Sequence, residues 1–186
     1  MTVGRAFTPP RGNSMVDSFP DQDALRNVLG HFTTGVTVVT TMTAVGPIGM
    51  TANSFSSVSL DPPLVLFSVS RASQLCTHLT KTGSFAVNIL NAEQQNLSRQ
   101  FSRPGLHRFG GMSWTRWMTG APILPDVLAV IECVVTDIHE GGDHFITVGR
   151  VVEAGLRAAE ERRPLIFFRG AYRELSRADE RPSRLE

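Results

Sequence analysis

Several short segments of alternating, often β-branched apolar residues follow one another along the chain with brief turns between them. Residues 36–42 show this alternation, Val45-Gly46-Pro47 is typical of a turn, and residues 48–52 return as the second strand of a hairpin. Strands that meet through such short turns favour antiparallel pairing in a sheet that closes into a barrel. We therefore expect a mainly β protein. Further strands are predicted at residues 64–69, 85–90, 127–138, 144–153 and 165–172.

Three short helices are predicted from their capping residues. Asp21 or Asp23 can cap a helix whose apolar positions 25, 28, 29 and 32 follow helical spacing. Ser73 can cap a second helix that runs to about residue 81 and is stopped by a glycine. Asn91, followed by a glutamine three residues later, resembles a capping box that opens a third helix ending near residue 101.

Length and composition predict one domain between two tails. The chain has 186 residues, of which 41% are hydrophobic and 19% charged, so it is long enough to form a real core. Residues 1–20 are rich in Pro, Gly and Ser without a period, and residues 176–186 are mostly charged. We expect flexible tails over residues 1–20 and 176–186, and a single domain over residues 21–175.

Charge and cysteine content exclude several function classes. A formal net charge of +1 gives no broad basic field, so we expect no nucleic acid partner and no polybasic membrane contact. No apolar run approaches the roughly 18 to 20 residues that span a bilayer, and no secretory signal is visible. Cys76 and Cys133 form no C-x-x-C pair and show no metal-ligand spacing with the histidines. We expect structural thiols, no metal site and a cytoplasmic protein.

Residues 50–64 combine an apolar run with small hydroxyl and amide side chains and end in a proline pair. Each Ser or Thr buried without a partner costs about 1 to 3 kcal/mol, so a strand buried for stability alone would carry larger aliphatic residues. So many short polar groups indicate a surface that binds a ligand. The alternative is a hydroxyl-rich edge strand whose side chains form local hydrogen bonds.

Five segments, in order along the chain, resemble the flavin reductase-like family. They are F-T-T-G-V-T-V-V-T-T from Phe32, M-T-A-N-S-F-S-S-V-S-L-D-P-P-L from Met50, F-A-V-N-I-L from Phe85, G-D-H-F-I-T-V-G-R-V from Gly142 and P-L-I-F-F-R-G-A-Y-R-E-L from Pro164. The resemblance covers about residues 24–175. It implies a mainly β, antiparallel split β-barrel of the FMN-binding type with peripheral helices, a homodimer, and a flavin near the subunit interface.

The function that the resemblance implies is NAD(P)H:flavin oxidoreductase activity. Such an enzyme transfers hydride from NADH or NADPH to FMN or FAD and supplies reduced flavin to a partner flavin-dependent monooxygenase. Two alternatives share the fold: a flavin-holding electron carrier or sensor, and a direct oxidase like the pyridoxamine-phosphate oxidases. The sequence does not distinguish FMN from FAD or NADH from NADPH, because it shows no acidic or basic ribose-recognition motif. No G-x-G-x-x-G follows a predicted strand, so a Rossmann site is not predicted for either cofactor.

The resemblance also implies which residues hold the flavin. Backbone amides beside small side chains suit both the polar edge and the apolar face of the ring. By the resemblance, the segment over residues 50–59 binds the ring, ribityl and phosphate portions of the flavin. The residues assigned to this role are Met50, Thr51, Ala52, Asn53, Ser54, Ser57, Val58 and Ser59.

A phosphate requires additional donors, and the predicted second helix begins just after a run of serines. Helix N-termini are anion sites, so Ser70, Ser73 and Thr77 can offer hydroxyls while Arg71 adds positive charge. In the alternative interpretation, Ser73 only caps the helix and Arg71 is a solvated side chain.

Hydride transfer between two cofactors needs positioning more than a side-chain acid, base or nucleophile, so no catalytic residue of those kinds is predicted. His144 follows a Gly-Gly-Asp turn and matches a family histidine associated with nicotinamide binding. Tyr172, the single tyrosine, can line the same pocket or simply pack. Phe101, Arg103 and Arg108 lie where the long connection over residues 102–126 could cover a cofactor, or they form an ordinary hydrophobic contact with solvated arginines. Trp114 and Trp117 could form a substrate wall, or an apolar layer that packs on the barrel.

Overall fold

The computed structural model describes residues 21–103, 105, 108–157 and 162–175. The main element is a seven-stranded antiparallel sheet with strand order β3-β2-β6-β9-β10-β5-β4. Its strands are β2 (Thr37–Thr43), β3 (Gly46–Ala52), β4 (Ser56–Leu60), β5 (Pro63–Ser70), β6 (Ser84–Ile89), β9 (Ala129–Gly141) and β10 (His144–Leu156). The tails predicted for residues 1–20 and 176–186 lie outside the described residues.

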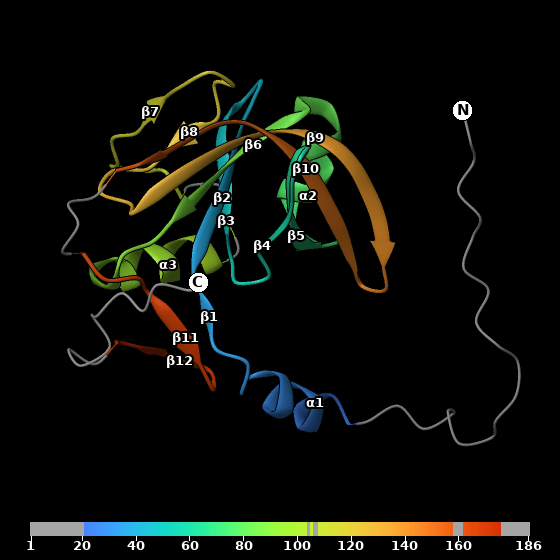
Figure 1. The fold of residues 1–186 in the computed structure, drawn as a ribbon, viewed down its shortest axis with the longest axis vertical. Helices are drawn as coiled ribbons and strands as arrows, with labels where there is room; N and C mark the ends of the chain where they lie inside the picture. The colour runs from blue at the N-terminus through green and yellow to red at the C-terminus, as the bar shows by residue number, and fades with distance from the viewer. Residues whose placement is uncertain (1–20, 104, 106–107, 158–161, 176–186) are drawn as a thin grey trace, which may run out of the picture.

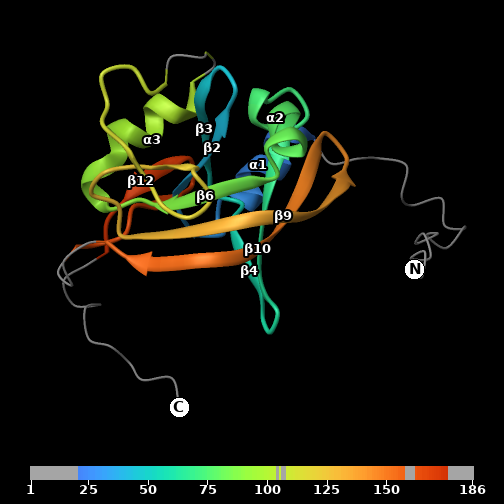
Figure 2. The ribbon, with the colours of Figure 1, turned by 90° about the horizontal axis from the view of Figure 1, so that it is seen from above.

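The sheet curls so that β3, at one edge, comes back beside β5 near the other edge (Figures 1 and 2). Among the described residues, β3 and β5 are not joined by a ladder of backbone hydrogen bonds. The hydroxyl of Ser54, just after β3, instead donates to the Ser68 carbonyl at 3.2 Å and accepts from the Ser68 amide at 3.0 Å. We call this gap between β3 and β5 the seam. The antiparallel sheet confirms the predicted mainly β fold. Among the described residues, the expected closure of the sheet by backbone hydrogen bonds is absent along the seam.

The three predicted helices form at the predicted caps. Helix α1 (Gln22–Leu29) begins at Asp21, whose carboxylate accepts from the Ala24 amide at 3.1 Å. Helix α2 (Gln74–Thr82) begins at the cap Ser73 and ends at Gly83, whose φ of +67° favours glycine. The capping box at Asn91 is present and opens a 3-10 turn, η1 (Ala92–Gln94), which continues into α3 (Gln95–Ser102). Among the described residues, no helix is long and apolar enough to cross a membrane.

A small second sheet corrects the prediction of a single strand over residues 165–172. The segment forms a hairpin, β11 (Ile166–Phe168) and β12 (Ala171–Arg173), to which β1 (Thr34–Gly35) adds a third strand. Arg169 and Gly170 connect the hairpin with φ values of +50° and +73°. Two successive positive φ values suit a tight hairpin turn whose twist matches the flanking strands. The prediction joined the apolar residues on the two sides of Arg169 and Gly170 into one strand, so the reversal was not predicted.

Apolar side chains pack on both faces of the main sheet, because neighbouring residues of one strand point to opposite faces. On β2, Val38 belongs to one buried cluster and Val39 to the other. Gly149 of β10 lies at a register shift beside Phe85, where an added Cβ would come within 2.4 Å of the aromatic ring. Only glycine fits at this position without displacement of the Phe85 ring.

Buried polar groups hold the long connection over residues 102–126 against the sheet. It contains β7 (Thr115–Arg116) and β8 (Pro122–Ile123). The fully buried Glu132 carboxylate accepts from the backbone amides of Met118 at 2.8 Å and Thr119 at 3.2 Å. Trp117 packs over Gly155, where an added Cβ would come within 3.1 Å of the indole. This contact agrees with the predicted apolar layer for Trp117.

Candidate functional site

The ends of four elements meet beside the seam. The Ser73 hydroxyl, at the start of α2, donates to the Met50 sulfur of β3 at 3.7 Å, and the Ser73 amide donates to the Ser70 carbonyl at 2.9 Å. Ser70, the last residue of β5, pairs with His144, the first residue of β10. Residues that lie far apart in sequence therefore line one region of the surface.

The residues around the end of β3 differ in how far their side chains are exposed to this region. Ala52 is only 5% exposed and belongs to the core, and its carbonyl accepts from the Thr37 hydroxyl at 2.7 Å. The Ser54 hydroxyl is engaged in the two hydrogen bonds to the Ser68 backbone across the seam. Asn53, between them, is exposed. A ligand at this position would meet the main chain and the Asn53 side chain, while the Ala52 methyl group stays inside.

Ser57, Val58 and Ser59 lie farther from the other predicted site residues. They belong to β4, an edge strand in which Ser59 pairs with Leu64 at the opposite end of β5 from Ser70. Six residues of strand correspond to about 20 Å. This segment therefore fits the alternative of a hydroxyl-rich edge strand with local hydrogen bonds. The Ser56 hydroxyl, for example, donates to the Ser57 carbonyl at 3.1 Å. One chain does not bring Ser59 beside Ser70.

Arg71 is bound to the β9–β10 turn. Its Nε donates to the Gly142 carbonyl at 2.8 Å, its Nη2 lies 3.4 Å from a Glu140 carboxylate oxygen, and its guanidinium lies 4.2 Å from the centre of the Phe145 ring. The side chain is therefore neither simply solvated nor turned freely toward the start of α2. Ser73 caps α2 as the alternative interpretation predicted, and Thr77 lies on the exposed side of that helix.

Arg108 is a second cation near the start of α2. It donates through Nη1 to the Gly49 carbonyl, and its Nε is buried without a hydrogen-bond partner among the described residues. With Gln74 and Leu75 it lines a narrow hollow between β3 and α2. Burial lowers the pKa of the Arg108 guanidinium. The sequence placed Arg108 only in a segment that could cover a cofactor, because its contact with β3 is non-local.

His144 carries an acidic partner from the preceding turn. Its Nδ1 lies 2.8 Å from a carboxylate oxygen of Asp143, and the histidine side chain is 45% exposed. The hydrogen bond from His144, followed by its charge, lowers the pKa of the Asp143 carboxyl. This contact fixes the orientation of an imidazole ring that solvent and ligands can still reach.

Tyr172 and Phe101 occupy the α3 side of the region. Ser98, fully buried on α3, accepts from the Thr51 hydroxyl through its carbonyl at 2.6 Å and from the Tyr172 hydroxyl through its own hydroxyl at 2.8 Å. Tyr172 is therefore tied to Thr51 through Ser98. Phe101 is fully buried, and its ring lies under Gly49, where an added Cβ would come within 3.0 Å. Its contact with a cofactor stays a prediction, since here the ring packs in the core.

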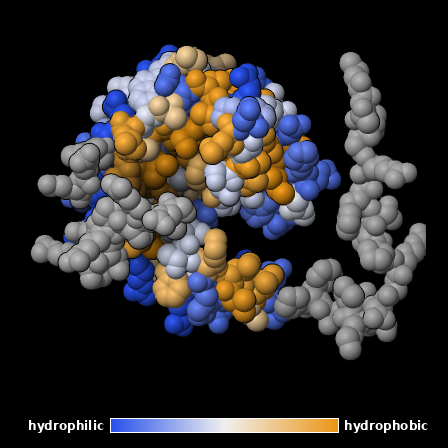
Figure 3. Space-filling view, in the orientation of Figure 1, coloured by the Kyte–Doolittle hydropathy of each residue, from blue (hydrophilic) through white to orange (hydrophobic). Residues whose placement is uncertain are grey.

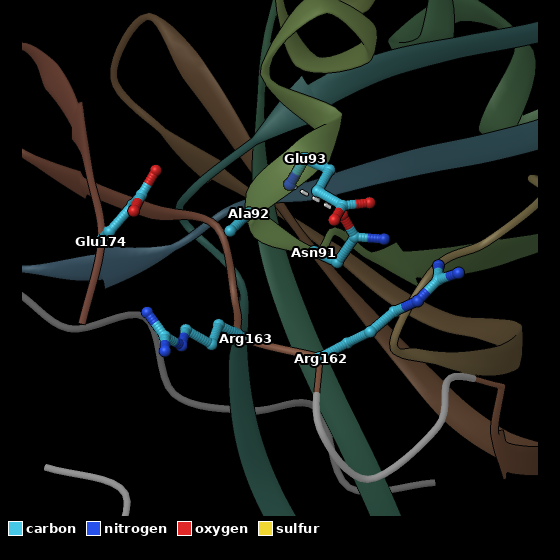
Figure 4. A pocket seen from close by; sticks show the side chains of 6 residues that line it. All are labelled: Asn91, Ala92, Glu93, Arg162, Arg163 and Glu174. Atoms are coloured by element: carbon cyan, nitrogen blue, oxygen red, sulfur yellow. Dashed lines mark hydrogen bonds between the residues drawn. The ribbon is translucent and has the colours of Figure 1, made fainter. Parts of the chain in front are cut away.

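A separate pocket of about 340 Å³ lies between the η1 turn and the segment before β11 (Figure 4). Its lining residues are Asn91, Ala92, Glu93, Arg162, Arg163 and Glu174. Its two arginines and two glutamates give the pocket lining no net formal charge. None of the predicted site residues lines this pocket. We therefore assign no cofactor to this pocket. Among the described residues, no three His, Cys, Asp or Glu side chains gather in a way that could hold a metal ion.

Comparisons with known proteins agree with this fold and identify its family. Residues 29–176 match the flavin reductase like domain. The FMN reductase (NADH) SmoA of Agrobacterium fabrum is 44% identical over 177 residues, which cover 95% of this chain and 99% of that protein. The chain belongs to the flavin reductase-like family.

Solved structures extend the similarity to three dimensions. The nitrilotriacetate monooxygenase component B homolog from Mycobacterium thermoresistibile has a TM-score of 0.84 at 39% identity, covering 89% of this chain and 92% of that one. The NADH:FAD oxidoreductase SgcE6 of Streptomyces globisporus, in complex with NAD and FAD fragments, has a TM-score of 0.80 at 38% identity, covering 86% and 96%.

Proposed function

We propose that this chain is an NAD(P)H:flavin oxidoreductase that reduces FMN or FAD and supplies the reduced flavin to a separate flavin-dependent monooxygenase. The observation that carries the proposal is the family match along nearly the whole described chain, together with a 44% identical relative named as an NADH-dependent FMN reductase. The similarity to a monooxygenase component B homolog supports a monooxygenase as the recipient.

The donors beside the seam fit a flavin. The backbone of residues 50–53 runs past small side chains, and Asn53, Ser70 and Ser73 add polar groups around it. A bound flavin supplies the ring that accepts hydride, while these residues bind and orient it. On this proposal Met50, Thr51, Ala52, Asn53 and Ser54 form the cradle, and Tyr172 supports it through Ser98. Ser57, Val58 and Ser59 would contact only a ligand that extends along β4.

For the flavin phosphate, we propose the start of α2 with Arg108 as its principal cation. The buried Nε of Arg108 lacks a partner among the described residues, whereas Arg71 already contacts Gly142, Glu140 and Phe145. A phosphate oxygen would satisfy that Nε and be attracted by the positive end of the helix. Ser70, Ser73 and Thr77 remain the proposed hydroxyl donors.

For the nicotinamide, we propose a position against His144. Its half-exposed ring is oriented by Asp143 and pairs across the ladder with Ser70, at the edge of the proposed flavin site. Few protein contacts would be needed there, since the nicotinamide would stack on the flavin ring. NADH is the proposed co-substrate, with NADPH as the alternative.

A homodimer is proposed from helix α1. Figure 3 shows an apolar surface over α1, in which Val28 is 68%, Leu29 is 63% and Phe32 is 77% exposed. No residue of α1 is buried, although the helix is amphipathic. Apolar side chains gathered on one helix face gain stability when another surface covers them. A second copy of the chain would provide that surface.

We propose residues 21–175 as a single flavin reductase-like domain, which the family match over residues 29–176 supports. We also propose a cytoplasmic location, supported by two cysteines that are free in the structure, because a reducing compartment keeps thiols unpaired.

The purified chain is expected to oxidise NADH at a rate that depends on added FMN or FAD, measured as the loss of NADH absorbance at varied flavin concentration. Exchangeable flavin acts as a second substrate under this proposal, so the rate should saturate with flavin. A rate of NADH oxidation that does not change with added flavin would instead indicate that the chain holds its flavin tightly and acts as an electron carrier. No oxidation with either flavin and either nicotinamide would refute the proposal.

In the same assay, His144→Ala should raise the KM for NADH severalfold, because the oriented ring beside the flavin is lost. His139→Ala is the matched control, since it removes an exposed histidine from the same hairpin. Flavin affinity, followed by fluorescence titration, should match that of the parent. An unchanged KM would assign His144 a structural role.

Arg108→Gln should weaken FMN binding more than riboflavin binding, because only FMN carries the phosphate. One charge-assisted hydrogen bond is worth roughly 1.5 to 3 kcal/mol, so the FMN-specific loss should be about tenfold or more. Arg71→Gln is the control and should leave the ratio of the two affinities as in the parent. Equal losses for both ligands in Arg108→Gln would mean that Arg108 only supports β3 through Gly49.

Val28→Asp should shift the chain from dimer to monomer, because it places a charge in the apolar face of α1. Asn27→Asp adds the same charge at the neighbouring position on the polar side and should leave the dimer intact. Light scattering coupled to size exclusion measures the mass against the 20.3 kDa of one chain. A monomeric parent, or equal behaviour of the two variants, would contradict the proposal.

A further inference from the structure

A cavity of about 70 Å³ lies under helix α2, against the outer part of the β9–β10 hairpin. Its lining residues are Val69, Cys76, Leu79, Thr80, Ile138, Phe145 and Thr147. Thr80 is exposed, while Cys76 is half-buried and its thiol is free. Figure 1 shows α2 beside β5 and this hairpin.

Thr147 gives this mostly apolar cavity an unusual polar group. Its side chain is fully buried, and its hydroxyl has no hydrogen-bond partner among the described residues. A buried hydroxyl without a partner costs about 1 to 3 kcal/mol. An oxygen atom placed in the cavity would satisfy the Thr147 hydroxyl, and the Cys76 sulfur lines the same space.

We propose that Cys76 is a peroxide-sensitive thiol whose sulfenic acid is accommodated in this cavity and stabilised by the Thr147 hydroxyl. In the reaction, the Cys76 sulfur attacks one oxygen of hydrogen peroxide, an S–O bond forms and the O–O bond breaks. The thiol and hydrogen peroxide give the sulfenic acid and one water, so the sulfur is oxidised and the peroxide is reduced.

The source of the oxidant rests on the proposed function, although the chemistry at Cys76 does not. Dioxygen that meets released reduced flavin is reduced to hydrogen peroxide while the flavin is reoxidised. Cys76 lies on the first turns of α2, whose start is the proposed phosphate site. A modification there would report peroxide formed close to the protein.

Cys133 provides an internal contrast. It is fully buried, and burial, followed by the charge of Glu132, raises the pKa of its thiol to about 12. Because the thiolate is the reactive form, Cys133 is expected to stay reduced. The sequence favoured a structural role for both thiols, but the structure places only Cys76 beside a cavity with an unpartnered hydroxyl.

To test this proposal, the full chain is treated with hydrogen peroxide in the absence of flavin and NADH. Sulfenic acid is then trapped with dimedone, and the modified peptides are identified by mass spectrometry. We expect an adduct on Cys76, none on Cys133 and none in Cys76→Ser. Omitting flavin separates this result from any failure of the proposed function. The absence of a Cys76 adduct, under conditions that oxidise glutathione, would overturn the proposal.

Two variants of Thr147 test the role of the hydroxyl. Thr147→Val removes it with little change of shape, and thermal unfolding verifies the fold. The sulfenic acid at Cys76 should then advance to sulfinic acid severalfold faster than in the parent. Thr147→Ser keeps the hydroxyl and should preserve the lifetime of the parent. Equal lifetimes in the parent and both variants would overturn the assignment of Thr147.

Discussion

The proposed flavin site depends on the hydrogen bonds that hold the curled sheet together along the seam. The Ser54 hydroxyl binds both backbone groups of Ser68, one as donor and one as acceptor. Each such hydrogen bond contributes only about 1 kcal/mol, yet this pair replaces the ladder that would otherwise join β3 to β5. The edge of β3 that faces β5 is therefore left without strand pairing, near the ends of β5, β10 and α2.

The short polar residues around the seam have different roles, because some hold the fold together and others face solvent. Ser54 and Ser73 stabilise the fold, one at the seam and one as the cap of α2. Thr51 binds Ser98 and so connects β3 to α3. Asn53 alone among residues 51–54 is exposed. On the proposed function, the segment over residues 50–54 would meet the flavin largely through its main chain, while the Thr51 and Ser54 hydroxyl groups hold that main chain in place.

The sequence predicted those features that depend on local chemistry. The caps at Asp21, Ser73 and Asn91 and the hairpin of β2 and β3 follow from neighbouring residues, and all are present. The Arg169-Gly170 turn was missed, because apolar residues flank it on both sides.

Non-local contacts explain the remaining differences in the candidate site. Arg71 was assigned to the phosphate from its position before α2, but its contacts come from the distant β9–β10 turn. Arg108 approaches β3 from the long connection, and no spacing in the sequence reveals that approach. The placement of His144 beside Ser70 likewise requires the pairing of β10 with β5.

The central claim is that a flavin lies over the main chain at the end of β3. Fluorescence titration of FMN against Asn53→Trp tests it directly, with Val45→Trp as a control at another exposed position outside the site. Asn53 suits this test better than Ala52, whose replacement would disturb the core. The account predicts that Asn53→Trp loses FMN affinity by at least about tenfold, or about 1.4 kcal/mol, through steric exclusion, while Val45→Trp binds like the parent. Equal FMN affinity in the two variants would contradict it.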